Sequence, residues 1–510
     1  MSIAKVYTAQ LIGLTSEIVT VEVDISNGLH SFSVVGLGDR AVEEAKDRIS
    51  AAIKNSGFVS PKQKNQKVII SLAPADVRKE GPSFDVAMAL GYLAATGDIE
   101  LDPDRKLFLG EVSLEGNVRR VSGVLPILCQ APKHGFTSAF IPRDNMAEAV
   151  LARDIIVYPV SSIREIVEHL NGIHRIEPVA RKNFSVDTTN QTHTHTHDMN
   201  MIRGNETAKR GLEIAAAGAH NIIMCGPPGT GKTMLAQSFR SILPALSYEH
   251  AVEVTSIHSA AHTLNTELIF QPPFRAPHHT ASYPAVIGGG SFPRPGEVTL
   301  AHRGILFLDE FPEFDRSVIE ALRQPLEDRS ITISRARGTV TFPAHCIFVA
   351  SMNPCPCGLG KDRGCTCSEK IIASYRRRLS GPILDRIDLW INVAKIDYNK
   401  LSAVDSTAES SAMVQERVRH ARTIQLERFK NAEHSLCYNS EMSARDIERH
   451  VTMTADARET LRKFAEKFHL SGRAFHRIIK VAQTIADLDG SSHIKKEFVL
   501  EALQYRQKDI

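Results

Sequence analysis

The 510-residue sequence lacks any long hydrophobic run: none of its apolar stretches approaches the ~20 residues that a membrane-spanning helix needs. The N-terminal segment, MSIAKVYTAQLIGLTSEIVTVEVD, alternates apolar and polar residues as a strand does, and it lacks the cleavage pattern of a signal peptide. These two absences exclude a membrane partner from the expected functions and favour a cytoplasmic protein.

A strong charge of one sign is also missing, because 61 basic side chains nearly balance 58 acidic ones and leave a net charge of +3. Contacts to DNA or RNA must therefore come from local basic segments and not from the whole surface. Only eight cysteines are present, and four of them lie within residues 355–367. This clustering favours a metal site in a reducing compartment over a disulfide scaffold.

The length predicts roughly three domains, and the pattern of the chain predicts where they end. Residues 1–172 alternate short strands and helices, 173–200 form a polar and repetitive linker, 201–395 form an α/β domain, and 396–510 are helical. His193, His195 and His197 in the linker could chelate a transition metal, although such a tract is more often solvated. The clearest expected elements are strands at 18–23, 31–35, 67–71, 139–142, 221–225, 304–308 and 346–351, and helices at 41–56, 83–96, 414–430 and 455–489.

A complete phosphate-binding loop, GPPGTGKT, lies between a predicted strand and a predicted helix. Its glycines let backbone N–H groups turn toward phosphates at the positive end of the helix. Lys232 would reach the β- and γ-phosphates of ATP, and the Thr233 hydroxyl would bind Mg²⁺. The alternative, a glycine-rich turn without function, is disfavoured by the flanking elements. The residues of the loop are Gly226, Pro227, Pro228, Gly229, Thr230, Gly231, Lys232 and Thr233.

Two further strands are predicted to end in polar residues suited to ATP hydrolysis. Gly304–Leu308 leads into Asp309, which would hold Mg²⁺ through water, and Glu310, which would polarise the attacking water. Cys346–Ser351 leads to Asn353, which could orient the same water. Alone, each could be an ordinary surface acid or the start of a turn.

These motifs resemble the AAA+ ATPases. Ile202 and Gly204, within Met201–Glu206, look like the adenine-side segment of that superfamily, and 322–338 is similar to its branch that includes magnesium chelatase motor subunits and MCM helicases. Within that branch, FRAPHHT, GGGSFPRPGEVTLAHRGILFLDE and LSGPILDRIDL look like the bacterial ComM/YifB group. The resemblance covers nearly the whole chain.

The resemblance implies an α/β AAA+ core with a helical lid, ATP and Mg²⁺ as cofactors, and a ring that is a homo-hexamer. It further implies that Asn353 is sensor 1, that Arg473 is sensor 2, and that Arg386 is the arginine finger given to a neighbour's ATP. A guanidinium offers a rigid fork for γ-phosphate oxygens. Without the other motifs, Arg386 could equally be a salt-bridged structural residue.

Residues 1–172 resemble the Lon protease domain through Lys79–Ser83 and Gly110–Val118. Ser83 matches the nucleophile of that family, but its partner lysine falls at Leu125, which cannot act as a general base. A structural or substrate-binding role is therefore expected in place of proteolysis.

Three segments are candidates for contact with DNA. The insert 274–295 holds Arg275, His278, His279 and Arg294, with Phe292 able to stack on a base. The predicted hairpin 331–342 carries Arg335 and Arg337, which suit phosphate contacts. The alternatives are a packed insert and an exposed arginine pair without a target.

The third segment holds Cys355, Cys357, Cys365 and Cys367, whose four thiolates could close a Zn²⁺ site. Cys-x-Cys pairs are less diagnostic than Cys-x-x-Cys pairs, so reduced structural cysteines stay the alternative. Bound zinc would stiffen a DNA-facing loop without doing chemistry.

The motifs together predict a hexameric AAA+ ATPase. The resemblance implies a helicase that acts on single-stranded, forked or branched DNA and promotes branch migration in homologous recombination during natural transformation. The alternative functions are a magnesium chelatase-like motor and a Lon-like protein-remodelling ATPase, each acting on a protein partner.

Overall fold

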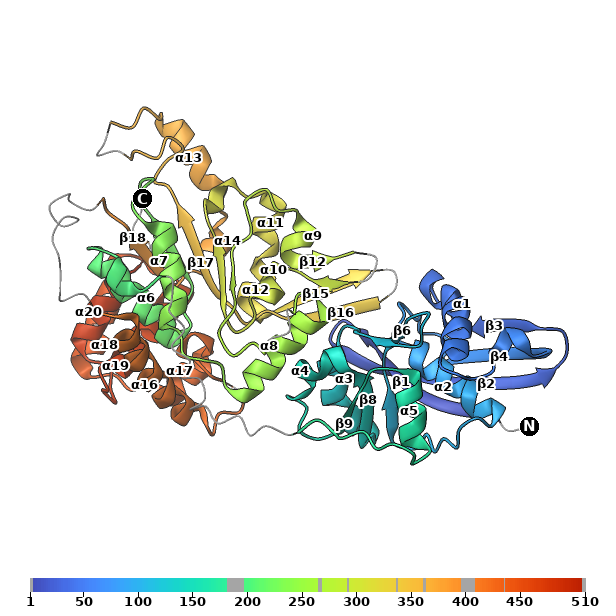
Figure 1. Ribbon diagram of the computed structural model, residues 1–510. Coiled ribbons are helices and arrows are strands. Elements are labelled where there is room, and N and C mark those ends of the chain that lie inside the picture. The colour runs from blue at the N-terminus through green and yellow to red at the C-terminus, as the bar shows by residue number, and fades with distance from the viewer. Residues whose placement is uncertain are drawn as a thin grey trace. The chain divides into compact units, whose positions relative to one another are not determined.

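The computed structural model describes residues 3–180, 197–264, 268–290, 293–335, 338–360, 364–395, 409–434 and 436–506 (Figure 1). The chain forms two compact units, Met1–Thr188 with Tyr248–Ile269, and Thr189–Ser247 with Phe270–Ile510. His193 and His195, with most of the predicted linker, lie outside the described residues. None of the helices in the described part of the chain combines the length and the apolar character that a bilayer-spanning helix needs.

The first unit is built on a mixed seven-stranded sheet of order β3-β4-β2-β1-β5-β8-β9. Strands β1 (Ala4–Ile12), β2 (Thr15–Asn27) and β4 (Gln66–Ala73) pair antiparallel, whereas the remaining neighbours pair parallel. These remaining strands are β3 (Ser31–Val35), β5 (Lys106–Phe108), β8 (Ser138–Pro142) and β9 (Ile156–Val160). The predicted strands at 18–23, 31–35, 67–71 and 139–142 are therefore all present.

Both faces of this sheet are covered by helices. On one face, alternate residues of β2 (Val19, Val21 and Val23) are fully buried with residues of α1 (Arg40–Asn55) and α2 (Asp85–Thr96). On the other face, α3 (Val124–Gln130) packs over the parallel strands. The period-2 burial of β2 is the expected result of side chains that alternate between the two faces of a strand.

Helix α8 (Tyr248–Ala260) follows the phosphate-binding motif in sequence but belongs to the first unit. The buried Ser259 hydroxyl donates to Oε2 of Glu148 (2.5 Å) and accepts from the Gly123 N–H (3.1 Å). The guanidinium of Arg153 lies 3.4 Å from the centre of the Tyr248 ring. These contacts hold α8 against residues that precede it by roughly a hundred positions or more.

The second unit contains a parallel five-stranded sheet of order β11-β14-β17-β10-β18. Its strands are β10 (Ile222–Cys225), β11 (Phe274–Arg275), β14 (Ile305–Leu308), β17 (Ile347–Met352) and β18 (Leu389–Asn392). Every residue of β10, β14 and β17 is buried, as in a parallel sheet covered on both faces. The parallel arrangement puts the carboxyl ends of these strands at one edge, where ligands bind in such folds.

Helices surround this sheet and extend its core. α6 (Glu206–Gly218) and α7 (Lys232–Phe239) pack on β18 and β17 respectively. α16 (Ser411–Phe429) and α19 (Gly472–Leu488) both pack on α6, so one hydrophobic cluster runs from the sheet into the C-terminal helices. The other C-terminal helices are α17 (Ala444–His450), α18 (Ala455–Lys467) and α20 (Lys496–Gln504).

The single helical run predicted at 455–489 is two helices in the structure. α18 ends at Lys467 and α19 begins at Gly472. His469 between them has φ 47°, in the left-handed region, and the Ser471 hydroxyl accepts from the Ala474 N–H at the start of α19. A capping serine after a left-handed residue ends one helix and starts another, which amphipathic periodicity alone does not reveal.

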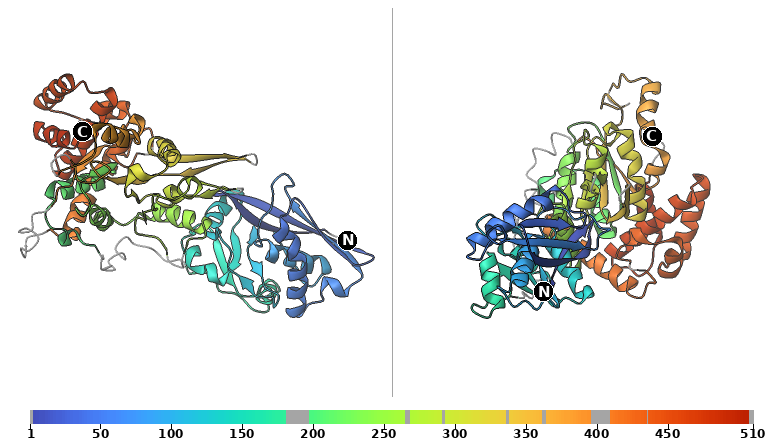
Figure 2. Two further views of the ribbon diagram at one scale, coloured as in Figure 1. Left: turned by 90° about the horizontal axis from the view of Figure 1, so that it is seen from above. Right: turned by 90° about the vertical axis from the view of Figure 1, so that its right-hand side faces the viewer.

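Two insertions lie between the strands of this unit. The first holds α9 (Tyr283–Ile287), β12 (Gly288–Gly289), β13 (Arg294–Pro295) and α10 (Glu297–Leu300); the second is the β15 (Ser330–Arg335) and β16 (Gly338–Pro343) hairpin. Within this unit the hairpin reaches beyond the helices (Figure 2). A Cβ on Gly288 would lie 3.0 Å from Cδ1 of Ile333, so the two insertions pack together.

Candidate nucleotide-binding site

The phosphate-binding loop connects the carboxyl end of β10 to α7. Gly231 has φ 85° and precedes the helix, so the loop makes a left-handed turn that favours glycine. A Cβ on Gly226 would meet the Val393 carbonyl oxygen at 2.3 Å, so no larger residue fits there. The Thr230 hydroxyl closes the loop on the Pro227 carbonyl (2.9 Å). Backbone N–H groups of the first turn of α7 are thereby available to an anion.

Lys232 is nearly buried and points into this loop. Its Nζ donates to the carbonyl oxygens of Gly226 (2.7 Å) and Pro227 (3.0 Å) and to Oδ1 of Asn353 (3.1 Å). Burial lowers the pKa of Lys232, while Asp309, Cys225 and Glu310 act in the opposite direction. All three bonded acceptors are neutral oxygens, so the ammonium group is held in place and suits an anionic ligand.

Asp309 and Thr233 form the part of the site that could hold Mg²⁺. The Thr233 hydroxyl donates to Oδ2 of Asp309 across 2.9 Å. The hydroxyl of Ser351, fully buried on β17, donates to Oδ1 of the same carboxylate. Hard oxygen ligands of this kind are those that Mg²⁺ prefers, and Ser351 orients the carboxylate.

Glu310 adopts a backbone conformation that only a few side-chain-bearing residues adopt. Its φ is 52° and its ψ 44°, in the left-handed region. Its N–H donates to the Ser351 hydroxyl (3.2 Å) and to Oδ1 of Asp309 (3.1 Å). Nδ1 of His279 lies 3.7 Å from Oε2 of Glu310. Strained backbone of this kind is typical of functional positions.

The predicted adenine-side segment lies against the helix that follows the loop. The 3-10 turn Met199–Met201 packs on α7, where the Ser238 hydroxyl donates to the Met199 sulfur at 3.4 Å. Ile202 is buried in the same core, and Gly204 follows it with φ 61°. This places the two predicted residues close to α7, whose first residue is Lys232.

Arg386 and Arg473 meet at a separate place, around Glu327 of α12 (Arg323–Asp328). Arg386 forms an ion pair with Oε2 of Glu327, and Nη2 of Arg473 lies 3.5 Å from Oε1. Burial lowers the pKa of Arg386, and the neighbouring Arg473 and Arg323 lower it further. One carboxylate therefore binds two guanidinium groups, and this concentrates positive charge suited to a phosphate.

The phosphate-binding residues and the arginine pair lie at opposite edges of the parallel sheet: the first edge is where the strands end, and the second is where they begin. Lys232 and Asn353 follow the carboxyl ends of β10 and β17, whereas the Arg386 carbonyl accepts from Nδ2 of Asn221, directly before β10. β10 has four residues and, at ~3.3 Å per residue, separates the edges by about 13 Å. The structure thus assembles Lys232, Thr233, Asp309, Glu310 and Asn353, and keeps Arg386 with Arg473 away from them.

The predicted DNA-contact residues have varied surroundings. Both nitrogens of the Arg275 fork bind Glu297 (2.6 and 2.7 Å), which raises the pKa of Arg275, so a phosphate would have to displace that carboxylate. His278 is bonded to the Thr280 hydroxyl (2.9 Å), and its ring lies against that of His279 at a tilt of 35°. His279 in turn faces Glu310. Arg294 is exposed on β13. Phe292, Arg337 and the side chain of Arg335 lie outside the described residues.

The four clustered cysteines occupy the loop after β17. Their sulfur atoms all lie within 4.8 Å of one another.

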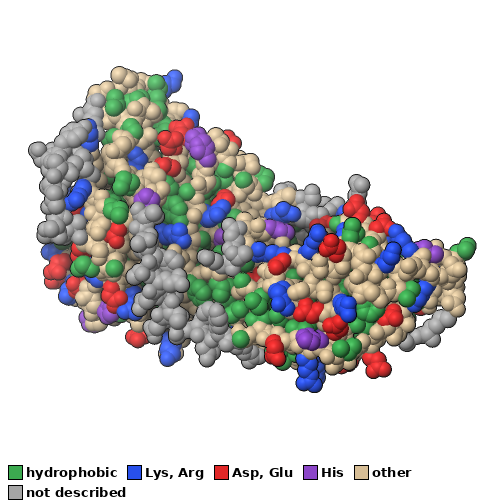
Figure 3. All heavy atoms as spheres, viewed as in Figure 1, with side chains coloured by type: hydrophobic (Ala, Val, Ile, Leu, Met, Phe, Trp, Pro, Cys, Tyr) green, Lys and Arg blue, Asp and Glu red, His purple; other side chains and the backbone are tan. Residues whose placement is uncertain are grey.

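Acidic and basic side chains are interspersed over the face of the molecule in Figure 3, in keeping with the near-zero net charge.

In the first unit, the position expected for a catalytic lysine is fully buried. Leu125 lies on α3 with no exposed surface, and its N–H donates to Oε2 of Glu148 (3.3 Å). The Ser83 carbonyl accepts from the Gly110 N–H (3.2 Å), which joins the two motifs that carry the Lon-like pattern.

Three residues of these sites were not predicted from the sequence. Ser351 connects Asp309 to Glu310, His279 was assigned to a DNA loop but faces Glu310, and Glu327 pairs with both arginines. The one available signal was Ser351, a polar residue within the continuous apolar run of a buried strand.

Family models for magnesium chelatase match most of the chain. The model described as magnesium chelatase, subunit ChlI, matches residues 198–401, which carry the phosphate-binding loop. A second model, for subunit ChlI of Mg-chelatase, matches residues 21–145, and the ChlI C-terminal model matches 408–506.

Similar proteins extend over the full length. "Competence protein ComM" of Haemophilus influenzae is 41% identical over 508 residues, 99% of this chain and 98% of that protein. "Uncharacterized protein YifB" of Salmonella typhimurium is 39% identical over 512 residues, with 100% and 98% coverage. A partial match, "DNA replication licensing factor Mcm2" of Drosophila melanogaster, is 27% identical over 39% of this chain and 19% of that protein. The chain belongs to the ComM/YifB family of magnesium chelatase-related AAA+ proteins.

Proposed function

We propose that this protein is a ring-forming ATPase, a homo-hexamer, that uses ATP hydrolysis to move DNA strands, as a helicase that promotes branch migration. The observation that carries the proposal is the division of its ATPase residues between opposite edges of one sheet. One edge holds Lys232 and Asp309, and the other holds Arg386 and Arg473. A complete site then requires two subunits.

The residues at the first edge, around Lys232 and Asp309, suit ATP and Mg²⁺. ATP would supply the phosphoryl group, and Mg²⁺ would offset its negative charge. The N–H groups of the loop and the Lys232 ammonium would bind phosphate oxygens. Thr233 and Asp309 would hold the cation, with Asp309 oriented by Ser351. Glu310 would accept a proton from the attacking water, and Asn353 would orient that water.

Arg386 and Arg473 would serve the ATP of the neighbouring subunit. Neither reaches its own phosphate-binding loop, because a strand of about 13 Å separates the two edges. In a ring, the same face repeats around the axis, so each arginine pair would meet the next subunit's Lys232 edge. The two arginines would exchange their bonds to Glu327 for bonds to phosphate oxygens.

DNA is proposed as the substrate that the ATPase moves, because the two insertions of the second unit, which pack together, carry basic residues. Arg294 is exposed on one. In the other, Arg335 is the last residue of β15, and Arg337 follows it by two positions in the sequence. The relative named "Competence protein ComM" supports a role in natural transformation, and the partial match to a replication licensing factor supports DNA as substrate.

The test is ATP hydrolysis by the full chain with and without forked or three-stranded DNA. We expect DNA to stimulate turnover, and Arg335→Ala with Arg337→Ala to weaken DNA binding and reduce its salt dependence by a slope of about 1 per lost phosphate contact. Arg462→Ala, an exposed arginine of α18, is the matched control. Unchanged turnover on every DNA form would refute the DNA motor.

A magnesium chelatase-like motor acting on a protein partner is the second candidate, favoured by the three ChlI models. It predicts turnover that responds to that partner and not to DNA. The same hydrolysis assay therefore separates the two functions.

A further inference from the structure

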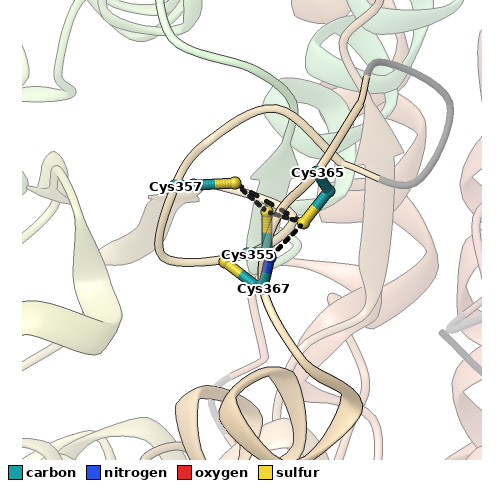
Figure 4. A group of neighbouring side chains, drawn as sticks. All are labelled: Cys355, Cys357, Cys365 and Cys367. Atoms are coloured by element: carbon teal, nitrogen blue, oxygen red, sulfur yellow. Dashed lines mark hydrogen bonds between the residues drawn. The ribbon is translucent and has the colours of Figure 1, made fainter.

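The four-cysteine loop, described at residues 355–360 and 364–367, brings its sulfur atoms together without a disulfide (Figure 4). The Sγ of Cys355 lies 3.3 Å from that of Cys357 and 3.4 Å from that of Cys365, and Cys357 lies 3.5 Å from Cys365. A tetrahedron of sulfurs around Zn²⁺, with Zn–S bonds of ~2.3 Å, has edges of about 3.8 Å. Three of the sulfurs are close to this spacing, and that of Cys367 completes the group within 4.8 Å. A disulfide would instead draw one pair of sulfurs to ~2.0 Å.

Backbone N–H groups of the loop also point at the sulfurs. The Gly360 N–H donates to Sγ of Cys355 (3.3 Å), and the Cys367 N–H donates to Sγ of Cys365 (3.4 Å). Hydrogen bonds of this kind stabilise the negative charge of metal-bound thiolates and orient them. They form because Gly358, Gly360 and Gly364 adopt left-handed turns with φ 81°, 75° and 74°.

The loop is anchored next to the nucleotide-binding site. Cys355, 1% exposed, follows Asn353 by two residues. A Cβ on Gly358 would lie 2.8 Å from Cδ of Pro228, so this turn packs directly against the phosphate-binding loop.

The helix that follows the loop also contacts this site. Ser368 caps α13 (Glu369–Arg377), which carries the buried Tyr375. Burial raises the pKa of Tyr375 to about 12, and a hydrogen bond from the Asn353 backbone acts against that shift. The loop therefore begins two residues after Asn353, and the helix that follows the loop contacts Asn353 through Tyr375. Asn353 is the residue that binds Lys232.

We propose that Cys355, Cys357, Cys365 and Cys367 bind one structural Zn²⁺, and that this centre braces Asn353 and the phosphate-binding loop for nucleotide binding. The four thiolates fill the coordination sphere, so the metal takes no part in chemistry. Without it, the loop loses the cross-link that holds Gly358 against Pro228. The brace rests on the proposed role of Lys232 and Asn353 in ATP binding, and it is independent of DNA.

The first experiment measures zinc in the purified full-length chain. We expect one zinc per chain, and cobalt substitution should give the absorption of tetrahedral thiolate coordination. Cys357→Ser and Cys365→Ser should each lose most of the metal, whereas Cys437→Ser, a half-buried cysteine elsewhere in the unit, should keep it. A metal-free wild-type chain, or oxidised cysteine pairs counted by thiol titration, would overturn the metal site.

The second experiment tests the brace on the wild-type chain, so that no variant has to fold. A chelator removes the metal, and the affinity for a fluorescent ATP analogue is measured before removal, after removal, and after zinc is returned. We expect a weakening of roughly tenfold or more that zinc reverses and magnesium does not. Unchanged affinity of the zinc-free chain would overturn the brace. If the zinc-loaded chain binds nucleotide but its turnover does not respond to DNA, the proposed DNA motor is refuted and the zinc brace is not.

Discussion

Arg386 is ion-paired with Glu327 at the edge of the parallel sheet where the strands begin, and the phosphate-binding loop lies at the opposite edge, where they end. The Arg386 side chain is 13% exposed, and the same carboxylate also contacts Arg473. This pairing gives the guanidinium a partner within its own subunit and leaves it no route to its own Lys232. An ATPase role for Arg386 therefore requires a neighbouring subunit.

Arg386→Ala should lower turnover on the order of 10³-fold at saturating ATP, because an arginine finger stabilises transition-state charge. Mixing Arg386→Ala chains with Lys232→Ala chains should restore activity. Random 1:1 mixing makes about a quarter of the interfaces complete, since an intact loop then faces an intact arginine. Activity no higher than the sum of the two variants would show that the arginine acts within its own subunit.

Glu327→Gln should leave turnover within about threefold of wild type, because the ion pair to Arg386 is replaced by phosphate in the working site. The free energy of unfolding should change by less than about 1 kcal/mol, as for other partly exposed ion pairs. Steady-state hydrolysis and urea unfolding measure the two effects. A loss as deep as that of Arg386→Ala would mean that Glu327 itself positions the finger during hydrolysis.

Lys232→Ala and Glu310→Gln should separate binding from hydrolysis. Lys232→Ala removes the buried ammonium and should abolish both ATP binding and turnover. Glu310→Gln keeps the shape of the side chain but removes the base, so it should bind ATP, hold the ring assembled and lose turnover by 10²-fold or more. Equilibrium nucleotide binding and phosphate release give the two readouts. Preserved turnover in Glu310→Gln would disprove its assignment.

His279→Ala should slow hydrolysis roughly tenfold with little change in ATP affinity, because His279 faces the carboxylate of Glu310. Its neighbour His278 is bonded to Thr280 and offers a matched control, so His278→Ala should leave basal turnover unchanged. The ratio of turnover in the two variants, measured without DNA, decides the point. Equal rates would place His279 outside the hydrolytic site.

Ser83→Ala should leave the protein unchanged, because the position expected for its lysine partner is the fully buried Leu125. Wild type and variant should both fail to degrade casein with ATP and Mg²⁺ present. Hydrolysis that disappears in the variant would instead identify a protease.

The local sequence pattern by itself determined which segments form strands and helices, and which residues lie at the carboxyl ends of the strands. The apolar runs before Gly226, Asp309 and Asn353 predicted buried strands, and a parallel sheet brings their carboxyl ends to one edge because all three run in the same direction. The phosphate-binding loop was equally predictable, since its spacing and its glycines specify backbone geometry within a few residues.

Only the tertiary structure decided which residues distant in sequence contact one another. Glu327 meets Arg386 and Arg473 across long stretches of sequence. His279 follows β11 and Glu310 follows β14, and the two residues meet because these strands are neighbours in the parallel sheet. α8 packs in the first unit because its buried Ser259 finds Glu148 there. Such contacts arise from packing and from the pairing of buried polar groups, which depend on neighbours distant in sequence and leave no periodic signal in the chain.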